Sequence, residues 1–455
     1  HIMKGYQVEN CRAYATSALR EAQNNQIVVD QVRVRTGIDI RVISNSEQRF
    51  ISYKAIASKD AEFQKVIQKG TAILDVGNQS TQISLFDKDS LVSTQNLPLG
   101  VVRLLEIMTH MKTTADKEQK LIQEIVDNEL VTFRKIYLKD RKIENLIGIG
   151  KVTLILYRRI MGEVNQRDRI TREEFNHFYG ILGRMTLDQI EDTFAVNADH
   201  ASLLLPAATI IRQVMEITGA DNIWVPGTIM LDGIAADYAE ERKLLKFNHN
   251  FANDIIVTSR NMAKRYKCHM PHIQAVENAA LQVFDSLKKY HGLKERERLL
   301  LQIAADLHSC GKFVTMRNAT EYAYNIIMAT EIIGLSHVER EIVANVVRYH
   351  LKTFQYKDIK IEARPSRISR LATPDNLTLT VAKLTAILRL ANSMDRSHNN
   401  KLAGCRIVIK NNKLVINTDY VGDVTLEALS IEEKADFFEE IFGLRPVLKQ
   451  KKGSK

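Results

Sequence analysis

The most informative stretch of the sequence is Leu74-Asp75-Val76-Gly77-Asn78-Gln79-Ser80-Thr81, which has the pattern of a strand, a tight turn and the start of a second strand. The apolar run begins at Thr71, and Thr81 to Phe86 alternates as the second arm of a hairpin. A turn at Asp87 to Ser90 then leads into a third strand, Leu91 to Gln95. Three consecutive strands with an acid and a glycine at one strand end predict a sheet that carries a site.

The residues of this turn suit a phosphate and a metal ion. An aspartate at a strand end, here Asp75, can hold Mg²⁺ directly or through water. Gly77 lets backbone N–H groups approach a phosphate closely, and Ser80 and Thr81 add hydroxyl donors. A tight hairpin with a solvated aspartate explains the motif equally well, so the two interpretations stay open at this point.

Two further side chains are candidates, and both lie near helix starts. Ser44-Asn45-Ser46 is an N-cap signal that places Glu47 in a first helical turn, where its carboxylate could deprotonate a water. Arg20 follows Thr16 and Ser17, and hydroxyls followed by arginine at a helix start suit a phosphate. The commoner roles are a helix-dipole partner for Glu47 and a surface cation for Arg20.

The hydropathy pattern changes twice along the chain. From about residue 101 to 220 it is mostly helical, with short strands at 146–150 and 223–227, which predicts an α/β domain. From about residue 250 it is helical, which predicts an all-α domain. A small α+β domain follows from about residue 404, with strands predicted at 405–409, 413–417 and 424–428 and a helix at 431–442.

Composition and charge narrow the class of protein. The chain has 455 residues, which suggests about three domains, and it is 45% hydrophobic and 26% charged. No window predicts a membrane span or an export signal, and the four cysteines are isolated from one another, so we expect a cytoplasmic location. The net charge of +10 favours an anionic partner, but no recognition motif supports specific nucleic-acid binding. The lysine-rich end from Lys449 predicts a solvated tail.

Several segments, taken in order, resemble the Ppx/GppA family of exopolyphosphatases and guanosine pentaphosphate phosphohydrolases. The resemblance runs nearly end to end and is fairly specific as a combination. The matching segments are Tyr14 to Ala22, Ile43 to Glu47, Leu74 to Gly77, Leu97 to Gly100 and Phe437 to Pro446.

The resemblance implies an α/β actin-like (ribonuclease-H-like) core, an all-α HD-like domain and a small α+β C-terminal domain. On that pattern, residues 1–48 are the remainder of actin-like domain I and 49–243 are actin-like domain II. Residues 244–400 are the HD-like domain, and 401–455 are the last domain. The family's first phosphate loop, Asp-x-Gly-Ser-Asn, does not occur here, so we expect it to lie before residue 1.

The resemblance also implies a Mg²⁺-dependent hydrolase that releases terminal phosphate from polyphosphate or the 5′ γ-phosphate of pppGpp. Glu47 corresponds to the family's catalytic glutamate, which activates water, and Asp75 to its metal-associated aspartate. Gly77 and the turn after it, with Ser80 and Thr81, correspond to the second phosphate loop. Arg20 is the basic residue we expect to guide the polyanion, and family members are commonly homodimers.

The departures from the family pattern indicate attenuated activity. Where the family has three glycines, this chain has Gly77-Asn78-Gln79, and Gln82 stands where the family has an acid. Glutamine can neither take up a proton nor add charge beside Mg²⁺. A later glycine-rich loop appears as Gly148-Ile149-Gly150-Lys151-Val152, which is equally well explained as a strand–helix turn. The alternative to a hydrolase is therefore a catalytically degraded regulatory protein that binds polyphosphate or an alarmone.

The helical domain resembles an HD phosphohydrolase that has lost its metal site. His272, His308 and Asp395 occur in the order that such a site requires, but Ser309 replaces the aspartate of the His-Asp pair. Without that carboxylate we expect a scaffold and no bridged metal pair. From the complete natural chain we expect weak phosphatase activity, and from these 455 residues little or none.

Overall fold

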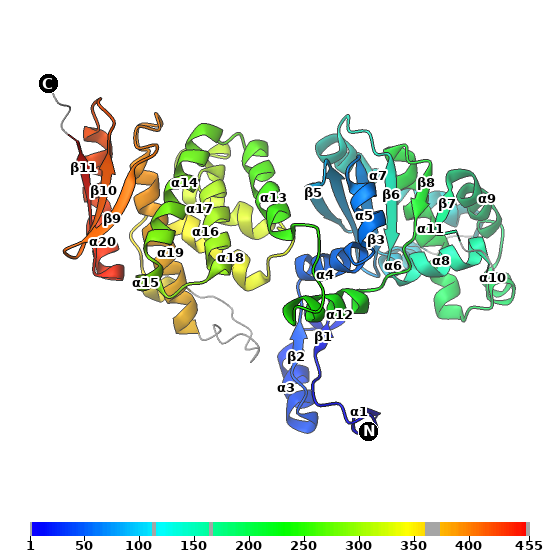
Figure 1. The fold of residues 1–455 in the computed structure, drawn as a ribbon. Coiled ribbons are helices and arrows are strands. Elements are labelled where there is room, and N and C mark those ends of the chain that lie inside the picture. Colours follow the sequence, from blue (N-terminus) through cyan, green and yellow to red (C-terminus); the bar gives the residue numbers. More distant parts are fainter. Residues whose placement is uncertain (1, 112–114, 163–166, 360–373, 452–455) are drawn as a thin grey trace. The chain divides into compact units, whose positions relative to one another are not determined.

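The computed structural model describes residues 2–111, 115–162, 167–359 and 374–451 (Figure 1). These residues form two compact units: residues 1–44 together with 258–455, and residues 45–257. We call them the first unit and the second unit, and each is described by itself. The architecture is mixed α/β. The four-part domain division made from the sequence and its actin-like assignment stay predictions.

The second unit is built on a six-stranded sheet with the order β5-β4-β3-β6-β8-β7. The predicted hairpin and third strand are confirmed, because β3, β4 and β5 form an antiparallel meander. β3 also pairs in parallel with β6, and β6 with β8, while β7 closes the edge in the antiparallel sense. The strands are Thr71–Val76, Thr81–Asp87, Ser90–Leu97, Asn145–Ile149, Arg169–Thr171 and Asn222–Trp224 for β3 to β8.

Helices cover both faces of this sheet. Alternation along β3 points Ala72, Leu74 and Val76 to one face, where they form one hydrophobic core with the helices that follow β5. These helices are α6 Val101–Met111, α7 Ala115–Phe133, α8 Lys151–Met161, α9 Arg172–Leu182, α10 Leu187–Phe194 and α11 Ala198–Thr218, with a π-helical turn Arg134–Leu138 after α7.

The opposite face of the sheet is covered by α4 (Asn45–Ala57) and α5 (Asp60–Ile67). Tyr53 of α4 packs on Phe86 of β4, with ring centroids 5.0 Å apart, and on Phe63 of α5. Helix α12 (Met230–Glu241) packs beside α4, and the Lys54 ammonium joins them through ion pairs with Asp237 and Glu240. The helix predicted to begin after Ser44 is therefore confirmed, with Glu47 in its first turn.

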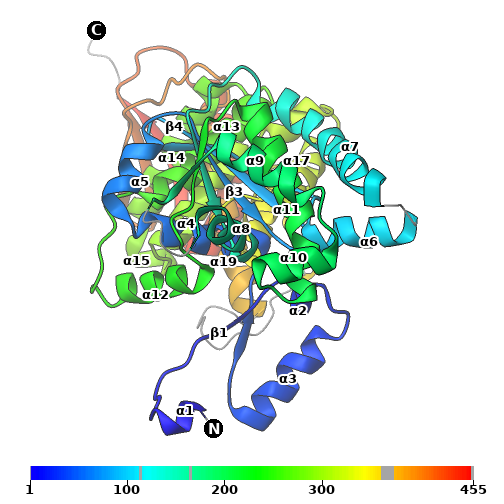
Figure 2. The ribbon, with the colours of Figure 1, turned by 90° about the vertical axis from the view of Figure 1, so that its right-hand side faces the viewer.

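The first 44 residues hold a two-stranded parallel sheet of β1 (Ala13–Ala15) and β2 (Ile40–Val42). Helix α1 (Ile2–Gly5) precedes it, and α2 (Ser17–Glu21) and α3 (Asn25–Thr36) connect its strands. The two strands and α3, coloured blue, lie near one another in Figure 2. The strand expected at 38–43 is thus confirmed in a shorter form.

The described part of the first unit between residues 258 and 394 is helical, as the sequence predicts. Its helices are α13 Phe251–Arg265, in which the boundary with the second unit falls, α14 Met270–Ser286, α15 Lys288–His291, α16 Glu295–Leu307, α17 Ala319–Ala329, α18 His337–Tyr349 and α19 Pro374–Met394, with 3₁₀ turns Cys310–Phe313 and Tyr356–Asp358. Among the described helices none is by itself long and apolar enough to cross a membrane. Helices α10 and α11 taken together would be long and apolar enough, but the pair is bent by 101°.

The C-terminal part corrects two sequence predictions. β9 (Arg406–Lys410) and β10 (Lys413–Thr418) are the predicted hairpin, but residues 424–428 are the start of helix α20 (Thr425–Phe442) and not a strand. The third strand is β11 (Arg445–Gln450), which pairs in parallel with β10. A parallel neighbour requires a crossover connection, and α20 provides it. Lys449 and Gln450 therefore belong to the sheet and not to a solvated tail.

Candidate functional site

The candidate site begins with a row of polar side chains across three strands. Asp75 of β3 pairs with Gln82 of β4, which in turn pairs with Asn96 of β5. Residues directly opposite one another share a face of the sheet, and here it is the face that α4 covers. Gln82 is buried, Asp75 is partly exposed and Asn96 is exposed. The row is therefore most buried at its middle residue, Gln82.

A buried arginine from α4 lies one row further along the same face. The next row pairs Ile73 with Ser84 and Thr94. Arg49 is only 4% exposed, and its Nη1 donates a 2.8 Å hydrogen bond to Thr94 Oγ1, while the Ser84 and Thr94 hydroxyls lie 2.9 Å apart. Two residues along a strand separate adjacent rows by about 7 Å, so this guanidinium lies beside the row of Asp75.

The contacts of α4 place its first turn at the Asp75 end of the sheet. Tyr53 packs on Phe86, which pairs with Thr71 at the start of β3, and Arg49 reaches the middle of the strand. The helix therefore runs with its N-terminus toward the end of β3. Glu47, partly exposed in that first turn, lies at the same end of the sheet as Asp75.

Burial and charge act in opposite directions on Asp75. Removal of water by the surrounding protein raises the pKa of its carboxyl group to about 6, and the positive charge of Arg49 offsets part of that rise. The neighbouring Gln82 has a buried Oε1 atom without a hydrogen-bond partner among the described residues. An unsatisfied buried acceptor is costly, so a hydrogen-bond donor that reached this row would be stabilised.

The loop after β6 closes against Asp75. Gly150 follows β6 and precedes α8, with a φ of 96° that side-chain-bearing residues rarely adopt. A Cβ atom at Gly150 would lie 2.8 Å from Asp75 Oδ1. Because β3 and β6 are parallel, Asp75 and Gly150 both lie at the carboxyl edge of these strands, where α/β sheets commonly bind ligands.

The β3–β4 turn is held closed by its own backbone. The Gly77 N–H donates to Ser80 O at 3.0 Å, and the carbonyls of Gly77 and Asn78 accept the N–H groups of Val101 and Val102 at the start of α6. Thr81 is fully buried, and its hydroxyl donates to the carbonyl oxygen of Leu99. Of the two predicted hydroxyls, Thr81 therefore braces the turn, whereas Ser80 is partly exposed.

Arg20 belongs to the first unit, so it is described apart from Glu47 and Asp75. Its Nη1 donates a 2.8 Å hydrogen bond to the carbonyl oxygen of Ile43. The hydroxyl of Thr16, the N-cap of α2, makes no capping hydrogen bond, and α2 has five residues. The guanidinium thus connects the end of α2 to the chain just after β2.

The residues around Asp75 do not fit a resident Mg²⁺ ion. The described residues contain no group of three or more His, Cys, Asp or Glu side chains that could hold a metal. At Asp75 the neighbour in the row is the neutral Gln82, and the charged neighbour is Arg49. A divalent cation prefers several anionic oxygens and is repelled by a fixed guanidinium.

The structure brings the three HD-like residues together in the helical domain. His272 Nδ1 lies 2.7 Å from Asp395 Oδ2, and His272 Nε2 lies 3.3 Å from His308 Nε2. His308 Nδ1 donates to the carbonyl oxygen of Ala305, and burial lowers the pKa of His308 well below its usual value. Both ring nitrogens of His272 thus face partners inside the cluster.

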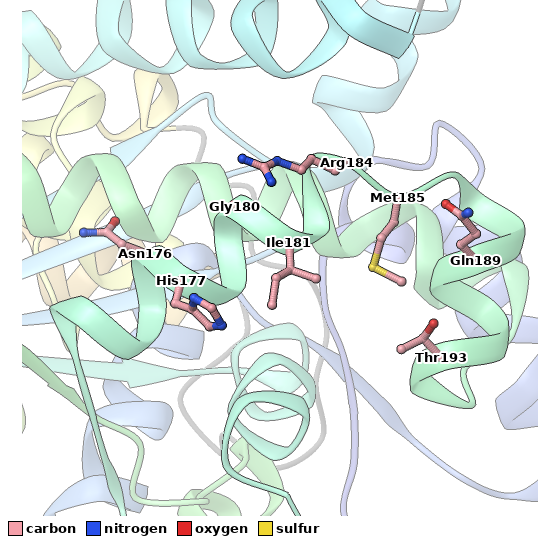
Figure 3. A pocket seen from close by; sticks show the side chains of 8 residues that line it. All are labelled: Asn176, His177, Gly180, Ile181, Arg184, Met185, Gln189 and Thr193. Atoms are coloured by element: carbon pink, nitrogen blue, oxygen red, sulfur yellow. The ribbon is translucent and has the colours of Figure 1, made fainter.

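A surface hollow of about 630 Å³ lies elsewhere in the second unit, between α9 and α10 (Figure 3). Ile181 and Met185 point into it, and His177 and Arg184 stand at its border. His177 and Arg184 are exposed, so the hollow lacks a buried polar group that would fix a ligand. It contains none of the predicted site residues.

Comparison with known proteins identifies the family. The model of the Ppx/GppA phosphatase family matches residues 1–240, and that of Ppx/GppA phosphatase domain III matches residues 256–435. The first match covers more than half of the chain. The chain therefore belongs to the Ppx/GppA phosphatase family, and the resemblance found in the sequence is confirmed.

Similar curated proteins are guanosine-5′-triphosphate,3′-diphosphate pyrophosphatases. That of Photobacterium profundum is 20% identical over 75% of this chain and 66% of its own length. That of Vibrio atlanticus is 21% identical over 84% and 72%. The chain thus spans about two thirds of the first relative. A solved Ppx/GppA family member from Aquifex aeolicus is 20% identical, with a TM-score of 0.45 over 55% of this chain and 78% of that one.

Sequence reasoning found Asp75, Gln82 and Glu47 but missed Arg49. An arginine within a helix usually lies on its solvated face, and the sequence around Arg49 does not contradict that. Its burial becomes evident once α4 is placed on the sheet and Thr94 is seen to accept its hydrogen bond. The one signal in the sequence was the spacing of Arg49 and Tyr53, which places both on one helix face.

Proposed function

We propose that this member of the Ppx/GppA family is a phosphoanhydride hydrolase with attenuated activity. It would release terminal phosphate from polyphosphate or the 5′ γ-phosphate from pppGpp. The observation that carries the proposal is the position of Glu47 and Asp75 at one end of the same sheet, beside the Gly150 loop at the carboxyl edge of β3 and β6.

In the proposed reaction Glu47 acts as the general base. Its carboxylate takes a proton from a water molecule while the water oxygen bonds to the terminal phosphorus. The bond between that phosphorus and the bridging oxygen breaks, and the bridging oxygen leaves with the shortened chain. Each turnover consumes one water and releases one inorganic phosphate.

The turn Gly77 to Ser80 is proposed to hold the terminal phosphate. Gly77 lets the turn close tightly, since a Cβ there would meet the Ser80 carbonyl oxygen at 2.8 Å, and the partly exposed Ser80 is proposed to donate its hydroxyl to the phosphate. Thr81 contributes indirectly, since its hydroxyl fixes the turn to Leu99. Asp75 orients the groups around the phosphate. Since its surroundings do not fit a resident metal, any Mg²⁺ would enter with the phosphates of the substrate.

The proposal also includes a role for Arg20, a homodimeric state and a cytoplasmic location. Arg20 would guide the polyanion, and the chain would act as a homodimer in the cytoplasm. Support for the compartment comes from the four cysteines, all of which are free thiols. Neither polyphosphate nor pppGpp is favoured by a contact in the structure, so both belong in the assay.

The test is phosphate release from long polyphosphate and from pppGpp, with Mg²⁺ present, by the complete natural chain, which is the parent here, and by its Glu47→Gln variant. A matched control is Glu173→Gln, which also removes a carboxylate from a first helical turn of the second unit. We expect Glu47→Gln to lower the rate about a hundredfold or more and Glu173→Gln to leave it unchanged. Equal rates for the parent and Glu47→Gln would contradict the proposal. Tight binding of either polyanion without release would favour the regulatory alternative.

A further inference from the structure

Arg49 is buried near Asp75 but has no role in the reaction proposed above. It is the buried cation of the α4-covered face, held by Thr94 at 2.8 Å and by the carbonyl oxygen of Asn45 at 3.4 Å. These bonds fix the guanidinium at the row next to Asp75. A guanidinium stays charged at any pH that a folded protein tolerates, so it carries a permanent positive charge into this row.

Arg49 offsets the negative charge of Asp75 without a metal ion. Asp75 brings one negative charge when ionised, Arg49 brings one positive charge, and Gln82 brings none. Among the described residues, the buried Oε1 atom of Gln82 has no hydrogen-bond partner. An amide oxygen can ligate a cation, but it adds no negative charge that would strengthen the binding. The fixed charge of Arg49 would repel a second cation placed here, because buried charges are only weakly screened by water.

We infer that Arg49 takes the electrostatic role of a resident metal ion beside Asp75, so that the site binds the phosphate end of its ligand without Mg²⁺. The inference rests on the proposed function, because it concerns the same site. Arg49 is a positioning residue here: it offsets the negative charge of Asp75, which would otherwise repel an incoming phosphate. Mg²⁺ would then assist turnover when carried by the substrate but would not be needed for binding.

The first measurement is calorimetric titration of Mg²⁺ alone into the ligand-free chain. We expect no saturable binding in the low millimolar range for the parent. Gln82→Glu adds a carboxylate beside Asp75 and should strengthen Mg²⁺ binding by about tenfold or more. A saturable Mg²⁺ site in the parent at micromolar concentrations would overturn the inference.

The second measurement is binding of inorganic tripolyphosphate in buffer with EDTA and in buffer with Mg²⁺. For the parent we expect affinities that differ by less than about threefold between the two buffers. Arg49→Met should lose about tenfold or more in EDTA and recover when Mg²⁺ is added. Arg212→Met is the control, because Arg212 is an arginine of the same unit that also donates to a neutral side chain, Asn176 at 3.0 Å, although it is more exposed than Arg49.

The outcomes separate the inference from the proposed function. A parent that binds and hydrolyses only with Mg²⁺ overturns the inference and leaves the hydrolase standing. A parent that binds tripolyphosphate in neither buffer overturns both. Arg49→Met that binds like the parent in EDTA also overturns the inference. If Arg49→Met does not fold, Gln82→Glu decides: the inference requires weaker binding in EDTA and recovery with Mg²⁺, and unchanged binding contradicts it.

Discussion

Gln82 and Gly150 define the surroundings of Asp75 at the scale of single residues. Gln82 faces Asp75 across the strand pair with an unsatisfied oxygen, and Gly150 leaves the space that the Asp75 carboxylate occupies. Gln82 is an uncharged side chain at the position where the family has an acid. Gly150 has a backbone conformation and surroundings that disfavour any larger residue. Each can be altered without touching Glu47.

Gln82→Glu should raise the rate of phosphate release in the presence of Mg²⁺ by about tenfold, because a second carboxylate would hold the substrate-borne cation. Steady-state assays with pppGpp and polyphosphate measure this. Gln95→Glu is the control, since its side chain is on the adjacent strand but on the other face of the sheet. An unchanged or lower rate for Gln82→Glu would show that the missing acid does not limit turnover.

Gly150→Ala should lower activity more than it lowers stability. The new Cβ would meet Asp75 Oδ1 at 2.8 Å and must displace it, and the positive φ adds strain of about 1–3 kcal/mol. Gly162→Ala is the control because it has a φ of 71°, and among the described residues, chain neighbours aside, no atom lies within 4 Å of the new Cβ. Chemical denaturation should show similar destabilisation of both variants. Similar activities would contradict the role of Gly150.

At the scale of elements, α4 links the site to the core of the second unit. Its N-terminal turn carries Glu47, its middle carries Arg49, and its C-terminal half is held by Tyr53. The Tyr53 hydroxyl donates to Asp254 Oδ2 at 2.7 Å and lies 2.6 Å from His249 Nε2. The position of Glu47 therefore depends on contacts made two turns further along the helix.

Tyr53→Phe should destabilise the protein by about 1–3 kcal/mol, because it leaves buried Asp254 and His249 without one partner. Urea denaturation measures the change. In Tyr179→Phe, the control, a buried hydroxyl with a longer 3.4 Å hydrogen bond from Thr209 is removed. Equal stabilities of Tyr53→Phe and the parent would show that the hydroxyl does not hold α4.

The elements also show how far the sequence could be interpreted. The hairpin at Thr71 to Phe86 and the helix after Ser44 were predictable because alternation and an N-cap are local signals. Residues 424–428 were mistaken for a strand because Val424 to Leu426 is a short run rich in β-branched residues, which does not distinguish a strand from a helix start. The partner that completes that sheet, β11, could not be predicted, since pairing across a crossover is not written in local sequence.

Part of the candidate site was predictable because it depends on local sequence signals. The rest was not predictable because it depends on contacts between distant elements. Asp75 lies near the end of β3, and Glu47 lies in the first turn of α4. Polar residues at the ends of strands and helices can be recognised from the local sequence. Arg49 acts only through the register of α4 on β4 and β5, which is a tertiary contact. The sequence therefore predicted the acids of the site but not the cation that balances one of them.

At the scale of the whole molecule, two buried groups of the first unit control stability in opposite directions as pH changes. Burial lowers the pKa of His350 to about 4 and raises the pKa of Asp306 to about 7. Unfolded His takes up its proton at about 6.5 and unfolded Asp at about 3.9. Between pH 4 and 6.5 the unfolded state thus binds more protons at His350, whereas the folded state binds more at Asp306.

Acidification in this window should therefore be destabilising through His350 and stabilising through Asp306. Asp306→Asn removes the second effect, so its melting temperature should fall more steeply than that of the parent from pH 6.5 to 4. The variant should also be more stable than the parent at pH 8, where Asp306 is ionised in both states. Scanning calorimetry across this range measures both, and identical pH profiles would contradict the assignment.

The most direct test of the central claim is a crystal structure of Glu47→Gln with tripolyphosphate bound. The account predicts that the terminal phosphate lies against the Gly77–Ser80 turn, beside Asp75 and within hydrogen-bond reach of the substituted side chain at position 47. A phosphate bound elsewhere, for instance in the hollow beside Arg184 shown in Figure 3, with the turn empty, would contradict it.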